Sequence, residues 1–181
     1  MNIFLIVVVI LVLLYNSLIS KKNQVENIYA SVDTLLKKRF DLIPSLIATV
    51  QEAMKHEKST LEEITALRSQ AMKGGISSDQ MSKIDSQLSS LLGSIMVAVE
   101  DYPELKANEN TLNLQHSLNE IEEQLSAARR AYNQAVTDYN NAIEMFPTNI
   151  LANYMRYTRK QVFRIIEGEK KNPNVKDLFN K

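Results

Sequence analysis

The chain has 181 residues, with 21 Lys plus Arg against 21 Asp plus Glu, four Gly, four Pro, and no Cys or Trp. The lack of Cys excludes a disulfide-stapled scaffold and Cys-based zinc or thiol chemistry. The zero net charge argues against a general nucleic-acid-binding protein, which needs a strongly basic face. Few Gly and Pro in a sequence rich in Leu, Ala, Glu, Lys and Gln predict an all-α protein with long helices.

The first predicted element is an apolar helix. Residues 3–14 are all apolar, and the first ionised side chain is Lys21. As a helix, residues 1–20 would span roughly 30 Å, the thickness of the hydrocarbon core of a bilayer. A cleaved signal peptide is the alternative, but no Lys or Arg precedes the apolar run and no small-residue cleavage site follows it. We therefore expect residues 1–20 to form an uncleaved transmembrane helix in a cell membrane.

Basic residues gather on the C-terminal side of this segment. They are Lys21, Lys22, Lys37, Lys38 and Arg39. The positive-inside rule then predicts an N-terminus outside the cell and a C-terminal domain in the cytoplasm. These five side chains either form a solvated face or contact anionic lipid headgroups or an acidic partner.

The next predicted helix continues from the transmembrane segment without interruption. Neither Gly nor Pro occurs between Ile3 and Phe40, and apolar residues keep helical spacing as far as Ala71. Pro44 either kinks this helix or begins a new one, and the unchanged phase favours a kink. Gly74 and Gly75 end the helix.

Three more helices are predicted after the glycine pair. The second begins at a Ser77–Gln80 capping box and ends before Pro103, and the third runs from Asn108 to Phe146. A last helix runs from Thr148 or Asn149 to Gly168. The expected architecture is a single N-terminal transmembrane helix followed by an elongated antiparallel four-helix bundle over residues 21–168, with a C-terminal tail at 169–181.

The sequence contains few features of a reactive centre. The Glu-x-x-His pairs that hold two metal ions in helical bundles do not occur, and Glu52 with His56 fits a surface pair instead. A Ser-His-acid triad would lack the sharp turn that exposes its nucleophile, and there is no Gly-rich phosphate loop. We therefore expect no cofactor, no metal and no small-molecule substrate.

Charged residues on the predicted apolar seams are the first polar feature of interest. Glu57 is in phase with Met54 and Leu61, while Arg68 and Arg129 also fall on or beside a seam. The favoured interpretation pairs Glu57 with one of these arginines across the bundle. A catalytic carboxylate and a plain surface position are the alternatives.

A heptad row of polar residues is the second feature. Its members are Asn119, Ser126, Asn133 and Asn140, each one residue after an apolar position. Because Asn is a poor helix former, such a row requires a reason. Either these side chains hydrogen-bond inside the bundle beside the tyrosines and specify its register, which we favour, or they face a partner.

An ordered series of short motifs resembles the LemA family of bacterial membrane proteins. The series covers nearly the whole chain: Tyr15-Asn16-Ser17-Leu18, Val32-Asp33, Leu36-Lys37-Lys38-Arg39, Asp41-Leu42-Ile43-Pro44, His56-Glu57, Tyr102-Pro103-Glu104-Leu105-Lys106-Ala107-Asn108, Leu114-Gln115, Ala128-Arg129-Arg130, Tyr132-Asn133, Tyr139-Asn140 and Phe146-Pro147. It weakens after Asn149, where Tyr154-Met155-Arg156-Tyr157 replaces an expected Gly-Phe dipeptide.

The resemblance implies an elongated helical bundle on one N-terminal span with a very short extracytoplasmic end. It implies no reaction. Glu57, Arg129, Arg130, Asn133 and Asn140 match motif positions of the family, which assigns them no accepted role.

Three functions remain open from the sequence. The first is a non-enzymatic membrane scaffold that assembles with itself or with other membrane or envelope proteins. The second is an adaptor that presents a partner or substrate to a membrane enzyme such as a protease. The third is an enzyme that uses Glu57 with an arginine, which we disfavour because buried ion pairs are ordinary in bundles.

Overall fold

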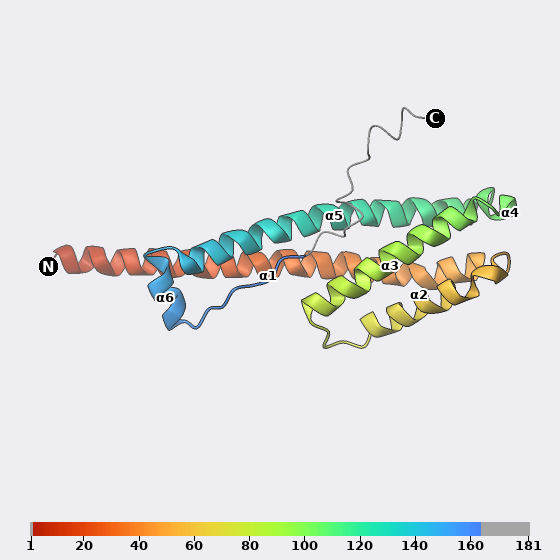
Figure 1. The fold of residues 1–181 in the computed structure, drawn as a ribbon. Helices are drawn as coiled ribbons and strands as arrows, with labels where there is room; N and C mark the ends of the chain where they lie inside the picture. The colour runs from red at the N-terminus through yellow and green to blue at the C-terminus, as the bar shows by residue number, and fades with distance from the viewer. Residues whose placement is uncertain (1, 164–181) are drawn as a thin grey trace, which may run out of the picture.

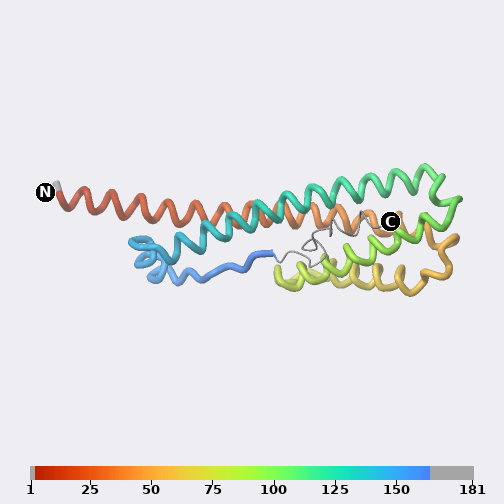
Figure 2. The backbone as a smooth tube through the Cα atoms, turned by 45° about the horizontal axis from the view of Figure 1, so that its top comes forward, coloured from red at the N-terminus to blue at the C-terminus, as the bar shows by residue number. Residues whose placement is uncertain are grey.

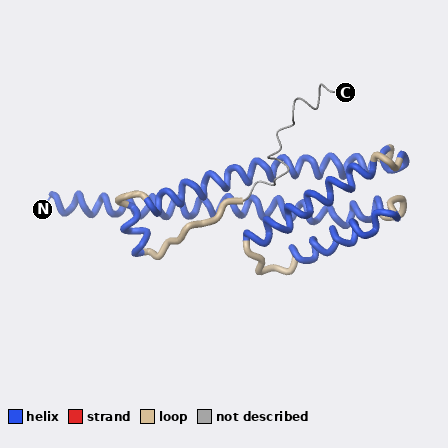
Figure 3. Tube along the Cα trace, in the orientation of Figure 1, coloured by secondary structure: helices blue, strands red, loops and turns tan. Residues whose placement is uncertain are grey.

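The structure is a computed structural model that describes residues 2–163, and every regular element in that range is a helix (Figures 1 and 3). This confirms the predicted all-α class. The elements are α1 (Asn2–Val50), η1 (Lys55–Glu57), α2 (Lys58–Ala71), α3 (Ser78–Val99), α4 (Pro103–Lys106), α5 (Glu109–Glu144) and α6 (Thr148–Tyr154).

Helix α1 is unbroken from its largely apolar residues 3–19, which we call the apolar segment, through Pro44 to Val50, as the absence of Gly and Pro before residue 40 predicted. Pro44 neither ends the helix nor begins a new one. Because proline has no N–H, it leaves the carbonyl of Phe40 without its usual partner one turn later. The Nε atom of Arg68 in α2 donates to that carbonyl at 2.9 Å. A side chain from a neighbouring helix thus supplies the hydrogen bond that Pro44 removes.

The predicted continuous helix from Pro44 to Ala71 is wrong. The chain reverses at residues 51–57, so that α2 returns antiparallel to α1 (Figure 1). The turn is closed by backbone bonds from Met54 N to Val50 O and from Glu57 N to Met54 O. Met54 is fully buried inside it. The reversal needs no Gly or Pro because a short 3-10 helix and one inward-facing Met hold the tight turn.

The end of α2 and the starts of α3 and α5 follow the predicted signals. Gly74 and Gly75 adopt φ of 72° and 71° after α2, a conformation that costs glycine little. Ser77 and Gln80 form the full capping box at the start of α3. The side chain of Asn108 accepts from the N–H groups of Asn110 and Thr111 at the start of α5. Capping chemistry therefore fixes the starts of α3 and α5 where the sequence predicted them.

The predicted last helix to Gly168 is also wrong. Helix α6 ends at Tyr154, and residues 155–163, which we call the strap, run back along the bundle without helical structure (Figures 1 and 3). The segment 164–168 and the predicted tail at 169–181 lie outside the described residues. Residues far away on α5 hold the strap, as described below, and local helical spacing could not reveal them.

The helices form two sections with different cross-sections (Figures 1 and 2). In the distal section, α2 and α3 pack beside the C-terminal part of α1 and the N-terminal part of α5, which makes an antiparallel four-helix bundle. In the proximal section, α6 and the strap pack on the remaining parts of α1 and α5. Helices α1 and α5 are the two long elements shared by both sections. The elongated bundle expected from the sequence is present, with α2 rather than a long last helix as its fourth member.

Candidate functional site

Four charged side chains from three helices meet in the distal section. Arg39 of α1 donates from Nη1 to Asp85 Oδ1 of α3 at 2.9 Å and to Ser89 Oγ at 2.8 Å. Arg129 of α5 bonds the other carboxylate oxygen, Asp85 Oδ2. Glu122 of α5 lies 2.9 Å from Arg39 Nη1 and 3.3 Å from Arg129 Nη1. We call these four residues the ion cluster.

The ion cluster is almost closed to solvent on its α1 and α3 sides. The side chains of Arg39 and Asp85 are 5% and 4% exposed, against 13% for Arg129 and 34% for Glu122. Burial raises the pKa of Asp85 above the ordinary carboxyl value, Arg129 and Arg39 offset part of that rise, and Glu122 adds to it. The charges of two arginines and two carboxylates cancel, so the cluster is a neutral internal network. Glu122 is its most solvent-exposed member.

The ion cluster replaces the ion pair expected from the sequence. Arg129 takes part, as its seam position suggested, but its partners are Asp85 and Glu122. Glu57 belongs to η1 at the distal turn and makes no ion pair among residues 2–163. Arg68 binds the Phe40 carbonyl instead. The turn at 51–57 explains the difference, because it removes Glu57 from the phase of an assumed continuous helix.

Asp85 was missed, although its signal was present in the sequence. It lies four residues after Met81 and three before Leu88, on the apolar stripe of α3, and it is 3% exposed. An acidic residue on that stripe needs a buried cation, and Arg39 has the matching position on α1, three residues after Leu36 and four before Ile43.

The predicted basic surface needs one correction. Arg39 does not lie on the surface with Lys37 and Lys38, because its side chain is buried in the ion cluster, whereas both lysines are exposed. Lys21 and Lys22 are half-buried at the other end of the domain. Lys22 lies 3.7 Å from Glu26 and 6.0 Å from the ring centre of Tyr157 in the strap. The five basic residues are therefore not one patch.

Two asparagines of the predicted polar row, Asn133 and Asn140, bind the strap. The amide of Asn140 pairs with both backbone groups of Lys160, with Nδ2 to O at 3.0 Å and N to Oδ1 at 2.9 Å. Asn133 pairs in the same way with Phe163, at 3.0 and 2.7 Å. Each side-chain amide thus hydrogen-bonds both the N–H and the C=O of one strap residue, as a residue of a neighbouring β-strand would. Asn133 and Asn140 thus hydrogen-bond inside the domain beside tyrosines, but their partner is the strap backbone and not another helix. In the other half of the row, Ser126 accepts a hydrogen bond from Arg130 Nη1 and Asn119 is exposed.

The tyrosine that precedes each of these asparagines in α5 also binds the strap backbone. The hydroxyl of Tyr139 donates to Thr158 O at 3.2 Å, and that of Tyr132 donates to Gln161 O at 3.4 Å. Seven residues of helix rise about 10.5 Å, and three residues of extended chain cover about 10 Å. Tyr-Asn pairs seven residues apart on α5 are therefore spaced like every third residue of an extended segment that runs antiparallel to the helix.

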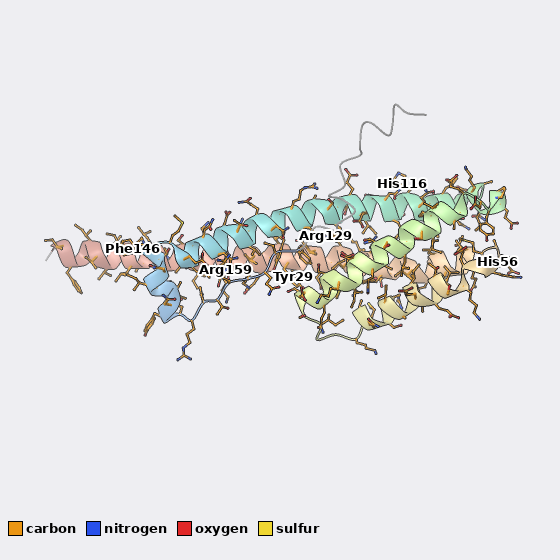
Figure 4. The ribbon with its side chains drawn as sticks, viewed as in Figure 1. Tyr29, His56, His116, Arg129, Phe146 and Arg159 are labelled. Atoms are coloured by element: carbon orange, nitrogen blue, oxygen red, sulfur yellow. The ribbon has the colours of Figure 1, made fainter. Side chains whose placement is uncertain are left out.

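Aromatic rings of α1 and α5 pack on Phe163, at the C-terminal end of the strap. The ring centres of Tyr132 and Phe163 are 5.0 Å apart, and Tyr29 of α1 lies 5.7 Å from Tyr132 and 6.3 Å from Phe163. Figure 4 shows Tyr29 in the middle of the molecule, between Arg159 at the proximal side and Arg129 at the distal side. The same figure shows His56 and His116 near the distal end, and both are exposed.

Comparisons with known proteins identify the family of this chain. The model of the LemA family matches residues 28–176. "Protein LemA" of Metamycoplasma hominis is 25% identical over 165 residues, which cover 91% of this chain and 75% of that protein. "Magnetosome protein MamQ 1" and "Magnetosome protein MamQ 2" of Paramagnetospirillum magneticum are each 31% identical over 80 residues, 44% of this chain and 29% of theirs. The family match spans most of the bundle, the strap and the ion cluster, and the chain belongs to the LemA family.

Proposed function

We propose that this protein is a membrane-anchored, non-enzymatic helical scaffold that displays its distal section to other proteins near a cell membrane. The observation that carries this proposal is α1 itself. One unbroken helix contains both the solvent-exposed apolar segment and a full side of the bundle core. Whatever holds the apolar segment therefore also fixes the position of the distal section.

The apolar segment has the properties of a membrane span. Helix α1 is long and apolar enough to cross a bilayer, with a mean hydropathy of 2.8 in its most apolar window, only 6% of which is buried by the protein. A signal sequence would share these properties. An anchor that stays in place is supported by Leu18, which is fully buried in the domain core. Cleavage after the apolar segment would cut the helix beside this packed residue.

A rigid α1 separates the basic residues into two groups. Lys21 and Lys22 lie within one turn of the apolar segment and can reach lipid headgroups. Lys37 and Lys38 lie roughly 25 Å farther along the helix axis, at about 1.5 Å per residue. Their exposed side chains fit an acidic protein partner better than a lipid surface.

The closed ion cluster supports a role without catalysis. A catalytic carboxylate must reach its substrate, but Asp85 is 3% exposed and both of its oxygens are bound by arginines. Such a network specifies which helices pack together and contributes little net stability.

Retention in the membrane tests the anchor. Val9→Lys places a charge in the middle of the apolar segment, where it costs about 3 kcal/mol in a bilayer. The variant should be released from membranes by an alkaline wash that retains the wild type. Val97→Lys, at a 72% exposed position of α3, is the matched control and should be retained. Release of the wild type would contradict the anchor.

Photo-crosslinking tests the scaffold. A photoreactive residue at Val97 or Leu112, both exposed in the distal section, should capture further copies of this chain or several membrane proteins. Capture of one membrane enzyme alone would favour an adaptor that presents partners or substrates to that enzyme.

Protection from an impermeant thiol reagent tests the orientation. The positive-inside rule places the domain in the cytoplasm. The chain has no Cys, so Glu62→Cys, exposed on α2, provides a single reactive thiol. It should be labelled only after the cells are opened. Labelling in intact cells would reverse the proposed orientation.

A further inference from the structure

Large apolar side chains are exposed where α5 turns into α6. Met145, Phe146, Ile150 and Tyr154 are 63%, 80%, 64% and 87% exposed, and we call them the apolar corner. Ile150 and Tyr154 are spaced four residues apart, which places them on one side of α6, and Met145 and Phe146 lie in the turn just before this helix. The other large exposed apolar residues beyond the apolar segment, among those described, are Met72, Val97, Leu112 and Val162, each on a different part of the chain.

The apolar corner lies beside the apolar part of α1. Helix α6 packs on α1 as well as on α5, at the end of the domain from which the N-terminal part of α1 projects (Figures 1 and 2). Figure 1 shows that α6 crosses the direction of α1 instead of following it. Figure 4 shows Phe146 at this same end. Of the described elements, only α1 projects past α6 at this end of the molecule.

The length of the apolar segment places this corner at the bilayer. The hydrocarbon core is about 30 Å thick and needs about 20 helical residues. The apolar segment of α1 covers residues 3–19, with Asn16 and Ser17 as its polar members, and corresponds to about 25 Å of helix. The whole segment is thus needed to cross the core, including the turn of Leu18. Leu18 is nevertheless fully buried by the domain, so lipid and domain meet around that turn.

Positive side chains flank the corner on the side of the strap. Arg156 and Arg159 are exposed and follow α6 directly, and Lys21 and Lys22 follow the apolar segment of α1. Glu144 is paired with Arg159. A short apolar surface bordered by cations is the pattern of a helix that lies in the interface of a bilayer containing anionic lipids.

We propose that the apolar corner inserts into the bilayer beside the span, as a second lipid contact made by the folded domain. The inference rests on the proposed membrane anchor, and its occupant is the lipid surface. Two contacts from separate parts of the chain fix the tilt and rotation of the bundle, which a single helix leaves free. The distal section is then held upright on the membrane.

Single tryptophans can test this proposal because the chain has none. The full-length protein is reconstituted in vesicles of phosphatidylcholine and phosphatidylglycerol, with or without bromine on the acyl chains. Four variants are compared: Val9→Trp in the apolar segment, Phe146→Trp and Ile150→Trp in the apolar corner, and Val97→Trp as an equally exposed apolar position in the distal section. All four positions are exposed, so the larger ring does not disturb the core.

The proposal predicts that brominated lipid quenches Phe146→Trp and Ile150→Trp, with blue-shifted emission, and leaves Val97→Trp unquenched. Quenching of Val9→Trp without quenching of the two corner variants would overturn the proposal and leave the anchor intact. No quenching of Val9→Trp would overturn the anchor, and with it this inference. Equal quenching at Val97 would mean that the whole bundle lies on the lipid, which also contradicts the proposal.

Discussion

The distal and proximal sections of this bundle are held together by different means. In the distal section, four helices share a continuous apolar core and one ion cluster that joins α1, α3 and α5. In the proximal section, two of those helices are replaced by the short α6 and by a strap whose backbone is hydrogen-bonded to side chains of α5. Packing between helices thus stabilises the distal section, and hydrogen bonds from side chains to the strap backbone stabilise the proximal section.

The largest expected effect breaks the distal section. Asp85→Ala removes the carboxylate that binds both arginines and leaves Arg39 buried without its main partner. We expect a loss of about 3–5 kcal/mol in the free energy of unfolding, because an uncompensated buried charge is costly. Urea unfolding of the protein in detergent, followed by circular dichroism, measures this loss.

The matched control is Glu62→Ala. Glu62 and Lys58 form an exposed pair on α2, and such pairs contribute about 0–1 kcal/mol. If Asp85→Ala destabilised the protein no more than this control, the ion cluster would not be the polar centre of the distal section.

The second prediction breaks the proximal section alone. Asn140→Ala removes both hydrogen bonds to Lys160 and should cost about 2 kcal/mol, since each bond contributes roughly 1 kcal/mol. Hydrogen exchange should show faster exchange of the amides of Lys160 and Phe163, while the amides of α2 and α3 stay protected. Asn141→Ala, at the exposed neighbouring position, should leave the strap unchanged. Equal loss of protection in both sections would mean that they are not separate units.

The third prediction is smaller and concerns Pro44. Arg68→Ala leaves the Phe40 carbonyl without a partner and should cost about 1 kcal/mol. In a Pro44→Ala background the new N–H can bond that carbonyl, so the same substitution should cost clearly less. A double-mutant cycle of unfolding free energies measures this coupling. Equal costs in both backgrounds would show that Arg68 does not compensate for the proline.

The two sections also differ in how far the sequence predicted them. The starts of helices α3 and α5 were predicted, because capping residues and apolar stripes are local signals. Their last residues, Val99 and Glu144, fall shortly before the predicted stops at Pro103 and Pro147. The strap was not predicted, because Tyr154, Thr158 and Val162 also fit helical spacing, and the asparagines that hold the strap are about 20–30 residues away. The turn at 51–57 was missed because no Gly or Pro marks it.

The ion cluster was only partly predictable. Arg129 was recognised by its position beside a seam, but Arg39 was grouped with Lys37 and Lys38 because the three are adjacent in sequence. Adjacent residues of a helix point about 100° apart. Arg39 shares the face of Leu36 and Ile43, which turns it into the core. The position of Arg39 around the helix therefore predicts its burial better than its neighbours in the sequence do.

The link between the apolar segment and the bundle depends on the continuity of α1, and one distance tests it. Spin labels at Ser20→Cys and Ala48→Cys, two exposed positions of α1, are separated by 28 residues and by Pro44. In lipid nanodiscs, an unbroken helix predicts a single narrow distance distribution centred at about 42 Å. A broad distribution, or a peak clearly shorter than this, would show that α1 bends or breaks and that the bundle is not rigidly joined to the span.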